Sequence, residues 1–232
     1  MTWRRIKSLL AIACLTLPLS ACDSLPGRPT QAELPLRPSD VSDFATLYNE
    51  NCAGCHGVDG KFGGAIALNN PVFLGIIDDA SLRRVITSGV PGTSMPSFGR
   101  SANGSLTDHQ IDLLVGGIRK SWSGSPDVSA GAPPYSSSAA GNPNNGALVY
   151  ASNCQSCHGA DGRGGSAGSI VDPSYLALVS NQYLRTIVIA GRSDLGHPDW
   201  KHTVSGHPLT TEQVSDVVAW ISSRRPVPMA SN

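Results

Sequence analysis

The sequence predicts an all-α protein that contains two tandem copies of one small domain. The first observation is a repeat, because adding 102 to a residue number carries many residues of the first half onto identical residues of the second. The aligned pairs include Tyr48 and Tyr150, Gly57 and Gly159, Asp59 and Asp161, Leu82 and Leu184, Gly89 and Gly191, and Pro96 and Pro198. The second observation is an apolar stripe at helical spacing near the end of each half. Internal duplication indicates two copies of one domain, and 232 residues suit two small domains better than one.

Helix boundaries can be predicted from capping residues. Ser39 or Asp40 is expected to cap a first helix that ends near Cys52. Ser81 is expected to cap a second helix, and Gly89 to end it. The last helix of each half is expected to begin with a capping box, made by Thr107 and Gln110 in the first half and by Thr210 and Gln213 in the second.

A five-residue motif, Cys-x-x-Cys-His, occurs once in each half. It is the attachment pattern of c-type haem. Each cysteine sulfur can form a thioether with one vinyl group of the porphyrin, and the histidine that follows can bind the iron. Two covalently bound haem c groups are therefore the expected cofactors. The expected attachment residues are Cys52, Cys55 and the iron ligand His56 for haem 1, and Cys154, Cys157 and the iron ligand His158 for haem 2.

The repeat also locates a second axial ligand for each iron, for which Met or His is the usual choice. Met95 lies 39 residues after His56 and starts a Met-Pro dipeptide. His197 lies 39 residues after His158 and starts a His-Pro dipeptide. We therefore expect Met95 to bind the iron of haem 1 and His197 the iron of haem 2. His202 and His207 lie nearby in the sequence and remain alternatives for haem 2.

On these residues each half resembles a class I cytochrome c domain, and the chain resembles the tandem dihaem cytochromes c. The resemblance extends from about residue 40 to residue 226 and implies, in each half, helices wrapped around one haem with the last helix crossing the first. His197 departs from the family pattern, which usually has methionine at this position. The resemblance implies a carrier of single electrons between redox proteins, free-standing or as a subunit of a respiratory or photosynthetic complex, and not an enzyme.

The same cysteines and histidines are compatible with two different kinds of site and with a second function. The Cys-x-x-Cys pairs could form zinc sites or, in an exported protein, disulfides. Zinc does not account for the ligand position 39 residues after each motif, and disulfides do not account for the histidines. A dihaem enzyme, peroxidase-like or thiosulfate-oxidising, is the alternative function, with His197 as the ligand that would leave the iron.

The N-terminal residues have the pattern of a targeting signal, with Arg4, Arg5 and Lys7 before a short apolar stretch. Leu19 to Cys22 resembles the bacterial lipobox, which implies that Cys22 is lipidated and anchors the protein to a membrane. An ordinary cleavage site before an unpaired cysteine is the alternative. Asp23 directly after this cysteine favours the inner membrane of a bacterial envelope, on its periplasmic side.

The expected organisation follows from these patterns. It comprises a signal peptide (1–21), a Pro-rich tether (22–39), a first haem domain (40–120), a Ser/Gly/Pro-rich linker (121–143), a second haem domain (144–226) and a tail (227–232). The chain has 17 basic and 17 acidic residues, so nothing in its charge indicates a nucleic-acid partner.

Overall fold

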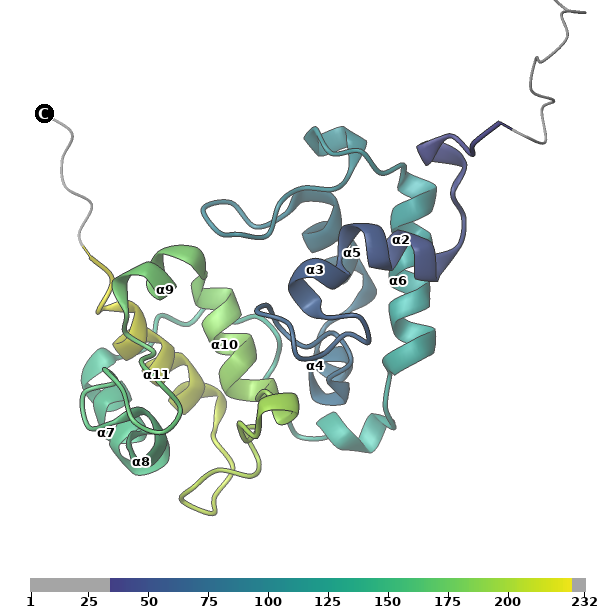
Figure 1. Cartoon of the computed structure of the whole chain (residues 1–232). Coiled ribbons are helices and arrows are strands. Elements are labelled where there is room, and N and C mark those ends of the chain that lie inside the picture. The colour runs from purple at the N-terminus through teal and green to yellow at the C-terminus, as the bar shows by residue number, and fades with distance from the viewer. Residues whose placement is uncertain (1–33, 227–232) are drawn as a thin grey trace, which may run out of the picture. The chain divides into compact units, whose positions relative to one another are not determined.

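The computed structural model describes residues 34–226, which contain helices and isolated β-bridges but no strand (Figure 1). The expected all-α class is confirmed. The expected signal peptide, the lipidation site Cys22, the tether as far as residue 33 and the tail all lie outside the described residues. Within residues 34–226, no helix combines the length and the apolar character needed to cross a bilayer.

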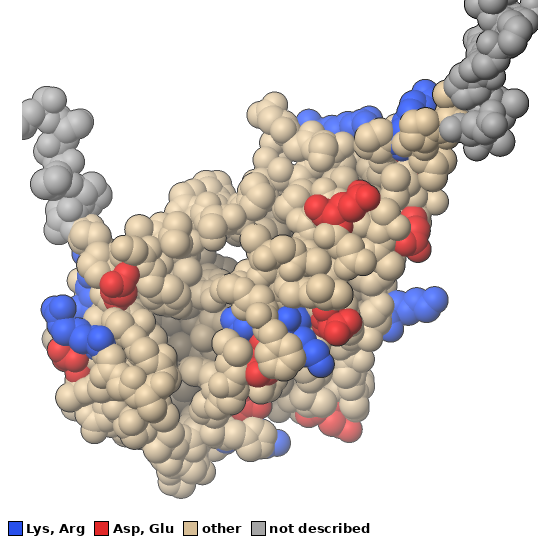
Figure 2. All heavy atoms as spheres, viewed as in Figure 1, with Lys and Arg blue, Asp and Glu red and all other residues tan. Residues whose placement is uncertain are grey.

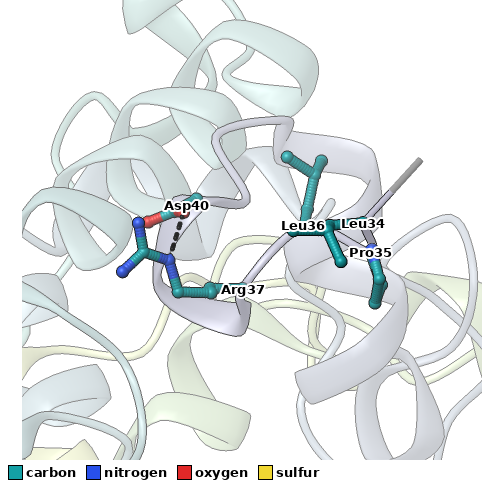
Figure 3. Close-up of a pocket in the computed structure, with 5 residues that line it drawn as sticks. All are labelled: Leu34, Pro35, Leu36, Arg37 and Asp40. Carbon is teal, nitrogen blue, oxygen red and sulfur yellow. Dashed lines mark hydrogen bonds and ion pairs between the residues drawn. The ribbon is translucent and has the colours of Figure 1, made fainter. Parts of the chain in front are cut away.

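The chain divides after Asp40 into two compact units. The described part of the first unit ends in the 3-10 helix η2 (Pro38–Asp40). Arg37 Nε donates a hydrogen bond of 3.1 Å to the carboxylate of Asp40. Arg37 and Asp40 line the pocket drawn in Figure 3 together with Leu34, Pro35 and Leu36, and no cysteine or histidine lines it. The pocket therefore takes no part in the sites described below.

The second unit begins at Val41 and contains both halves of the repeat. Each α-helix of the first half has a counterpart in the second, in the same order. The first half comprises α2 (Phe44–Asn51), α3 (Ala53–His56), α4 (Pro71–Ile76), α5 (Asp79–Ser88), η3 (Arg100–Ala102) and α6 (Asp108–Trp122). After η4 (Pro126–Ser129), the second half comprises α7 (Pro143–Asn153), α8 (Gln155–His158), α9 (Pro173–Leu178), α10 (Asn181–Ala190), η5 (Ser193–Leu195) and α11 (Thr211–Ser222).

Two of the expected helix starts are wrong, and in both cases an aspartate is the cap. The N-cap of α2 is Asp43, whose carboxylate accepts a hydrogen bond of 2.8 Å from Thr46 N. The N-cap of α5 is Asp78, whose carboxylate accepts one of 2.7 Å from Ser81 N. Ser81 therefore lies within the first turn of α5 and donates to the cap instead of forming it.

The other expected boundaries are confirmed. Thr107 and Gln110 form a capping box at the start of α6. Thr210 and Gln213 form the equivalent box at the start of α11. Gly89 ends α5 with φ at 64°, a conformation that glycine adopts without a steric penalty.

In each half the first helix packs closely against the last, α2 against α6 and α7 against α11 (Figure 1). A Cβ atom added to Gly117 of α6 would collide with the ring of Phe44. In the second half the large and small residues change places, because a Cβ on Gly146 of α7 would lie 2.8 Å from the Cβ of Trp220. Phe44 and Gly146 are equivalent in the repeat, as are Gly117 and Trp220 after a one-residue insertion. Both halves thus keep a close helix crossing with opposite choices of residue.

The two halves contact each other, which the linker composition could not predict. Asn70, the N-cap of α4, donates from Nδ2 to the carbonyl of Ala190 at the end of α10 over 2.9 Å. The linker itself lies along α10, because Pro134 and Tyr135 accept hydrogen bonds from the buried guanidinium of Arg185. The linker is therefore packed against the second half.

Candidate haem-binding sites

Each Cys-x-x-Cys-His motif forms a single helical turn directly after the first helix of its half. In the first motif, His56 N donates to the carbonyl of Cys52 over 3.0 Å. In the second, His158 N donates to the carbonyl of Cys154 over the same distance. These turns, α3 and α8, bring the cysteines and the histidine of each motif together, as attachment of one porphyrin requires.

The two motif histidines are oriented by backbone carbonyls. Nδ1 of His56 lies 2.8 Å from the carbonyl oxygen of Ile66, and Nδ1 of His158 lies 3.0 Å from that of Gly168. A hydrogen bond at one imidazole nitrogen fixes the ring and leaves the other nitrogen for a metal. Ile66 and Gly168 are equivalent in the repeat although their side chains differ, because only their carbonyls are used. No side-chain signal in the sequence could therefore have identified these acceptors.

Burial further favours the metal-binding form of His56. Desolvation is the main cause that lowers the pKa of His56, and the nearby cation Arg192 lowers it further, against the hydrogen bond to Ile66. A lowered pKa keeps the imidazole neutral at physiological pH, and the neutral form is the one that binds iron.

In each motif the first cysteine is partly buried and the second is exposed. Burial raises the pKa of both Cys52 and Cys154 to about 11. Cys55 and Cys157 are the exposed pair. One attachment point of each haem is thus enclosed by protein, and the other lies at the surface.

Two tyrosines, one in each half, support the backbone just after the motif histidines. Tyr48 Oη donates to the carbonyl of Gly57 over 2.7 Å, and Tyr150 Oη makes the equivalent bond to Gly159. Both tyrosines are almost fully buried, so each bond satisfies a polar pair that water does not reach. The repeat aligns these two tyrosines, and the structure shows that they make equivalent hydrogen bonds.

The two loops expected to carry the distal ligands have the same backbone geometry. Val90 N donates to the carbonyl of Met95 over 3.0 Å, and Arg192 N donates to the carbonyl of His197 over 3.1 Å. A glycine with positive φ precedes each loop. A Cβ on either glycine would lie 2.7 Å from the carbonyl oxygen of the ligand residue, from Gly89 to Met95 and from Gly191 to His197. Met95 is half-buried on its loop, and its bond to iron remains a prediction.

In the second half the rings of the two expected ligands lie close together. The imidazole rings of His158 and His197 have centroids 6.0 Å apart and planes inclined by 49°. An imidazole nitrogen binds a transition metal at about 2.0 Å, and the ring centre lies roughly 1.2 Å behind it, so two rings on opposite sides of one iron have centres about 6 Å apart. The separation therefore fits a haem iron held between these two histidines.

The competing histidines do not lie in this position. His202 bonds through Nδ1 to the carboxylate of Asp199, and its side chain is 72% exposed. His207 is exposed on the same stretch of chain. Of the three candidates, the structure brings His197 next to His158.

Two buried polar atoms at and near His197 have no hydrogen-bond partner. Among the described residues, Nδ1 of His197 and Nε1 of Trp200 are buried without a hydrogen-bond partner. Buried polar atoms are normally paired, so the unpaired Nε1 of Trp200, three residues after the ligand loop's His197, fits a site completed by a cofactor. Burial is the main cause that lowers the pKa of His197, and the proximity of His158 adds to it, against the effect of the Pro198 backbone; a lowered pKa favours the neutral, metal-binding form.

The proteins similar to this chain include a curated relative and a chain of known structure. The Cbb3-type cytochrome c oxidase subunit CcoP of Azospirillum sp. (strain B510) is 31% identical over 136 residues, which cover 54% of this chain and 41% of that protein. The match thus spans less than half the length of this relative. A chain of the reducing HAO-like protein complex of Kuenenia stuttgartiensis matches with a TM-score of 0.41 and 19% identity, over 78% of this chain and 95% of that chain. Similarity at that level carries no argument about fold or function.

A family match covers most of the described chain. The family described as cytochrome C oxidase, cbb3-type, subunit III matches residues 39–116 and 141–221. Each matched segment contains one Cys-x-x-Cys-His motif and one distal-ligand loop, so the two covalently attached haem c groups expected from the motifs are confirmed. The chain therefore belongs to this family of c-type cytochromes.

Proposed function

We propose that the protein is a membrane-anchored dihaem cytochrome c that carries single electrons between redox proteins as part of a respiratory electron-transfer chain. The observation that carries the proposal is the 6.0 Å separation of the His158 and His197 rings. An iron with protein ligands on both faces is suited to electron transfer, because no position is open for a substrate. The proposed ligand pairs are His56 with Met95 and His158 with His197.

The residues of each half have separate tasks in this function. The motif cysteines attach the haem, which supplies one-electron chemistry at its iron. The carbonyls of Ile66 and Gly168 orient the proximal imidazoles. Buried side chains exclude water from the sites, while Cys55 and Cys157 lie at the surface, where a partner can approach.

The two halves are proposed to differ in reduction potential. Methionine as an axial ligand raises the potential of a c-type haem, so the site with Met95 lies above the site with His197. Electrons then enter through the second half and leave through the first.

The proposed partners are redox proteins of a membrane complex. Support comes from the relative, which is named as a subunit of a Cbb3-type cytochrome c oxidase. Attachment through a lipid on Cys22, at the periplasmic side of the inner membrane, would hold the haems near such a complex. Acidic and basic side chains are interspersed on the face shown in Figure 2, and no extended basic surface there indicates a nucleic acid.

A redox titration of the purified holoprotein, combined with turnover assays, tests the proposal. The expected result is two separate potentials, the higher belonging to the haem with methionine, and no turnover of peroxide or thiosulfate. Turnover together with a high-spin haem would reject the carrier. A single shared potential would reject the proposed direction of electron flow.

One observation favours a second candidate, a dihaem enzyme of the peroxidase-like or thiosulfate-oxidising kind. Nδ1 of His197 makes no hydrogen bond as well formed as the one from Nδ1 of His158 to Gly168, and second-shell bonds of this type strengthen a ligand. His197 is therefore the ligand more easily displaced. Carbon monoxide added to the reduced protein distinguishes the two functions, because rapid binding at haem 2 indicates a displaceable ligand and no binding indicates the carrier.

A further inference from the structure

Four residues join the proximal loop of haem 1 to the distal loop of haem 2. Arg192 Nη2 donates to the carbonyl of Gly63 over 2.9 Å. Phe62 N donates to Asp194 Oδ2 over 2.8 Å. Arg192 and Asp194 are themselves joined by two bonds, from Nε to Oδ1 over 2.9 Å and from Nη2 to Oδ2 over 2.8 Å. We call these four residues the interhaem clamp.

The ion pair of the clamp is buried. The side chains of Arg192 and Asp194 are only 9% and 4% exposed. By contrast, the pair between Arg163 and Asp161 in the same half is exposed to 76% and 58%. Removing two charges from water is unfavourable, and such a pair persists where its remaining hydrogen bonds are satisfied. Here Gly63 and Phe62 of the other half supply those bonds, so the pair is complete only when the halves are in contact.

At its first-half end the clamp lies directly against the motif of haem 1. A Cβ on Gly63 would lie 2.6 Å from the carbonyl carbon of His56, so the backbone of Gly63 touches the motif turn. Ala65 N donates to the carbonyl of Cys55 over 2.9 Å. The carbonyl of Ile66, one residue further, orients His56. A movement of Gly63 is therefore passed to the proximal ligand.

At its second-half end the clamp is continuous with the distal ligand of haem 2. Arg192 N donates to the carbonyl of His197 over 3.1 Å, and His197 N donates to the carbonyl of Arg192 over 3.0 Å. Asp194 lies between these two residues on the same loop, in η5. The residue that contacts Gly63 is thus the residue that holds the backbone of His197.

The clamp has no equivalent in the first half, although the loops are otherwise alike. The repeat places Val90 opposite Arg192 and Gly92 opposite Asp194. The ion pair is therefore not needed to build a distal-ligand loop, because the loop of Met95 forms without one.

The clamp also fixes the conformation of Phe62. This residue has φ at 63°, which is unusual for a large side chain, and it is 65% exposed. A strained backbone persists where its surroundings determine it, and the bond from Phe62 N to Asp194 does so here.

We infer that Arg192 and Asp194 are positioning residues that set the rate of electron transfer between the two haems, an inference that rests on the proposed electron-carrier function. In this step one electron passes from the ferrous iron of haem 2 to the ferric iron of haem 1. Haem 2 is oxidised and haem 1 is reduced, and no bond forms or breaks. The rate of such a transfer falls steeply with the distance between the haem edges. The clamp joins one ligand loop of each haem and so holds that distance constant.

The inference can be tested on the intact holoprotein by flash photoreduction, with the absorbance of each haem followed while the electron redistributes. Arg192→Gln removes the ion pair, and Arg192→Lys keeps the charge but loses the two-bond geometry. Both variants are expected to slow the redistribution several-fold, because the rate of electron transfer falls as the haem edges move apart. Arg83→Gln is the control, because it removes ion pairs with two exposed aspartates, Asp108 and Asp112, inside the first half. It is expected to match the parent.

The outcomes separate this inference from the proposed function. A parent-like rate in both Arg192 variants, with two haems attached and unchanged ligand spectra, overturns the clamp and leaves the carrier intact. A slow rate in Arg192→Gln with a parent-like rate in Arg192→Lys also overturns it, because charge and not position would then be responsible. If the parent itself shows an open iron and turnover, the carrier fails whatever the variants do.

A measurement on the unaltered protein covers the case in which the Arg192 variants do not fold. Phe62 is an exposed loop residue whose amide donates to Asp194, so hydrogen exchange at this amide reports the clamp directly. Slow exchange, comparable to the helix amides, is expected. Exchange as fast as that of an unpaired loop amide would show that the clamp does not persist in solution.

Discussion

The imidazole rings of His158 and His197 lie with their centroids 6.0 Å apart, although 39 residues separate them in the sequence. Helix α8 positions the first ring, and the loop after Gly191 positions the second. Because one iron fits between rings at this spacing, the relationship makes a specific prediction about the spectrum of haem 2.

Replacing His197 by alanine is expected to open the iron of haem 2. Without the distal imidazole this haem becomes high-spin and binds added imidazole or cyanide, while haem 1 keeps its spectrum. Visible absorption with ligand titration measures the change. His202→Ala is the matched control, since His202 is exposed and paired with Asp199. The assignment would be wrong if His202→Ala, and not His197→Ala, gave the high-spin haem.

Exchanging the distal ligands is expected to move the two potentials in opposite directions. Met95→His lowers the potential of haem 1, and His197→Met raises that of haem 2, because methionine favours the ferrous state. Shifts of tens to hundreds of millivolts are expected, within the range of roughly 0.8 V that axial ligands control. Potentiometric titration of each variant measures them. Unchanged potential of haem 1 in Met95→His would exclude Met95 as its ligand.

Two adjacent glycines of α6 are expected to respond oppositely to the same substitution. Gly117→Ala places a methyl group against the ring of Phe44 and should destabilise the first half by about 1–3 kcal/mol. Gly116→Ala meets no atom within 4 Å. It should stabilise the helix by roughly 0.5–1 kcal/mol. Denaturant unfolding of the holoprotein measures both, and equal effects would contradict the close crossing of α2 and α6.

The bonds from Tyr48 and Tyr150 are expected to contribute to stability within each half. Tyr48→Phe removes one of two hydrogen bonds to the carbonyl of Gly57, which also accepts from Gly60 N, and Tyr150→Phe does the same at Gly159, which also accepts from Gly162 N. The loss expected is about 0.5–1.5 kcal/mol in each case, the net contribution of one hydrogen bond. Comparison of unfolding midpoints with the parent measures it. A loss below the error of the measurement would show that water replaces the hydroxyl.

Asp194 is expected to make stability depend on pH. The hydrogen bonds from Arg192 are the main cause that lowers the pKa of Asp194, with a further contribution from Phe62 N against the effect of burial. A carboxylate with a lowered pKa in the folded state stabilises the protein above its ordinary pKa, about 3.9, and loses that contribution as the pH falls through the lowered value.

The free energy of unfolding of Asp194→Asn should therefore lie below that of the parent at neutral pH, and the gap should close in acid. Asp127→Asn, at an exposed position in η4, is the control. Its free energy of unfolding should equal that of the parent both at neutral pH and in acid. A gap for Asp194→Asn that persists or widens in acid would contradict the ion pair.

Much of the fold could be predicted because the repeat supplied each pattern twice. The capping boxes at Thr107 and Thr210 are local, so their sequence signal was sufficient. The starts of α2 and α5 were missed because several capping residues occur in succession. At α5, Asp78 takes the cap since its carboxylate reaches Ser81 N, which the sequence alone does not show.

The site was predicted only where the chemistry is local or periodic. The motif residues and the position of His197 follow from spacing. The interhaem clamp was missed because it depends on how the halves pack, which neither half encodes alone. A signal existed, since Arg192 and Asp194 replace Val90 and Gly92 in an otherwise similar loop.

The low-temperature EPR spectrum of the oxidised holoprotein tests the central claim most directly. Two ligand sets, His56 with Met95 and His158 with His197, predict two low-spin signals of equal intensity, one typical of His/Met and one of bis-His ligation. A high-spin signal from either haem, or two signals of the same ligand type, would contradict the account.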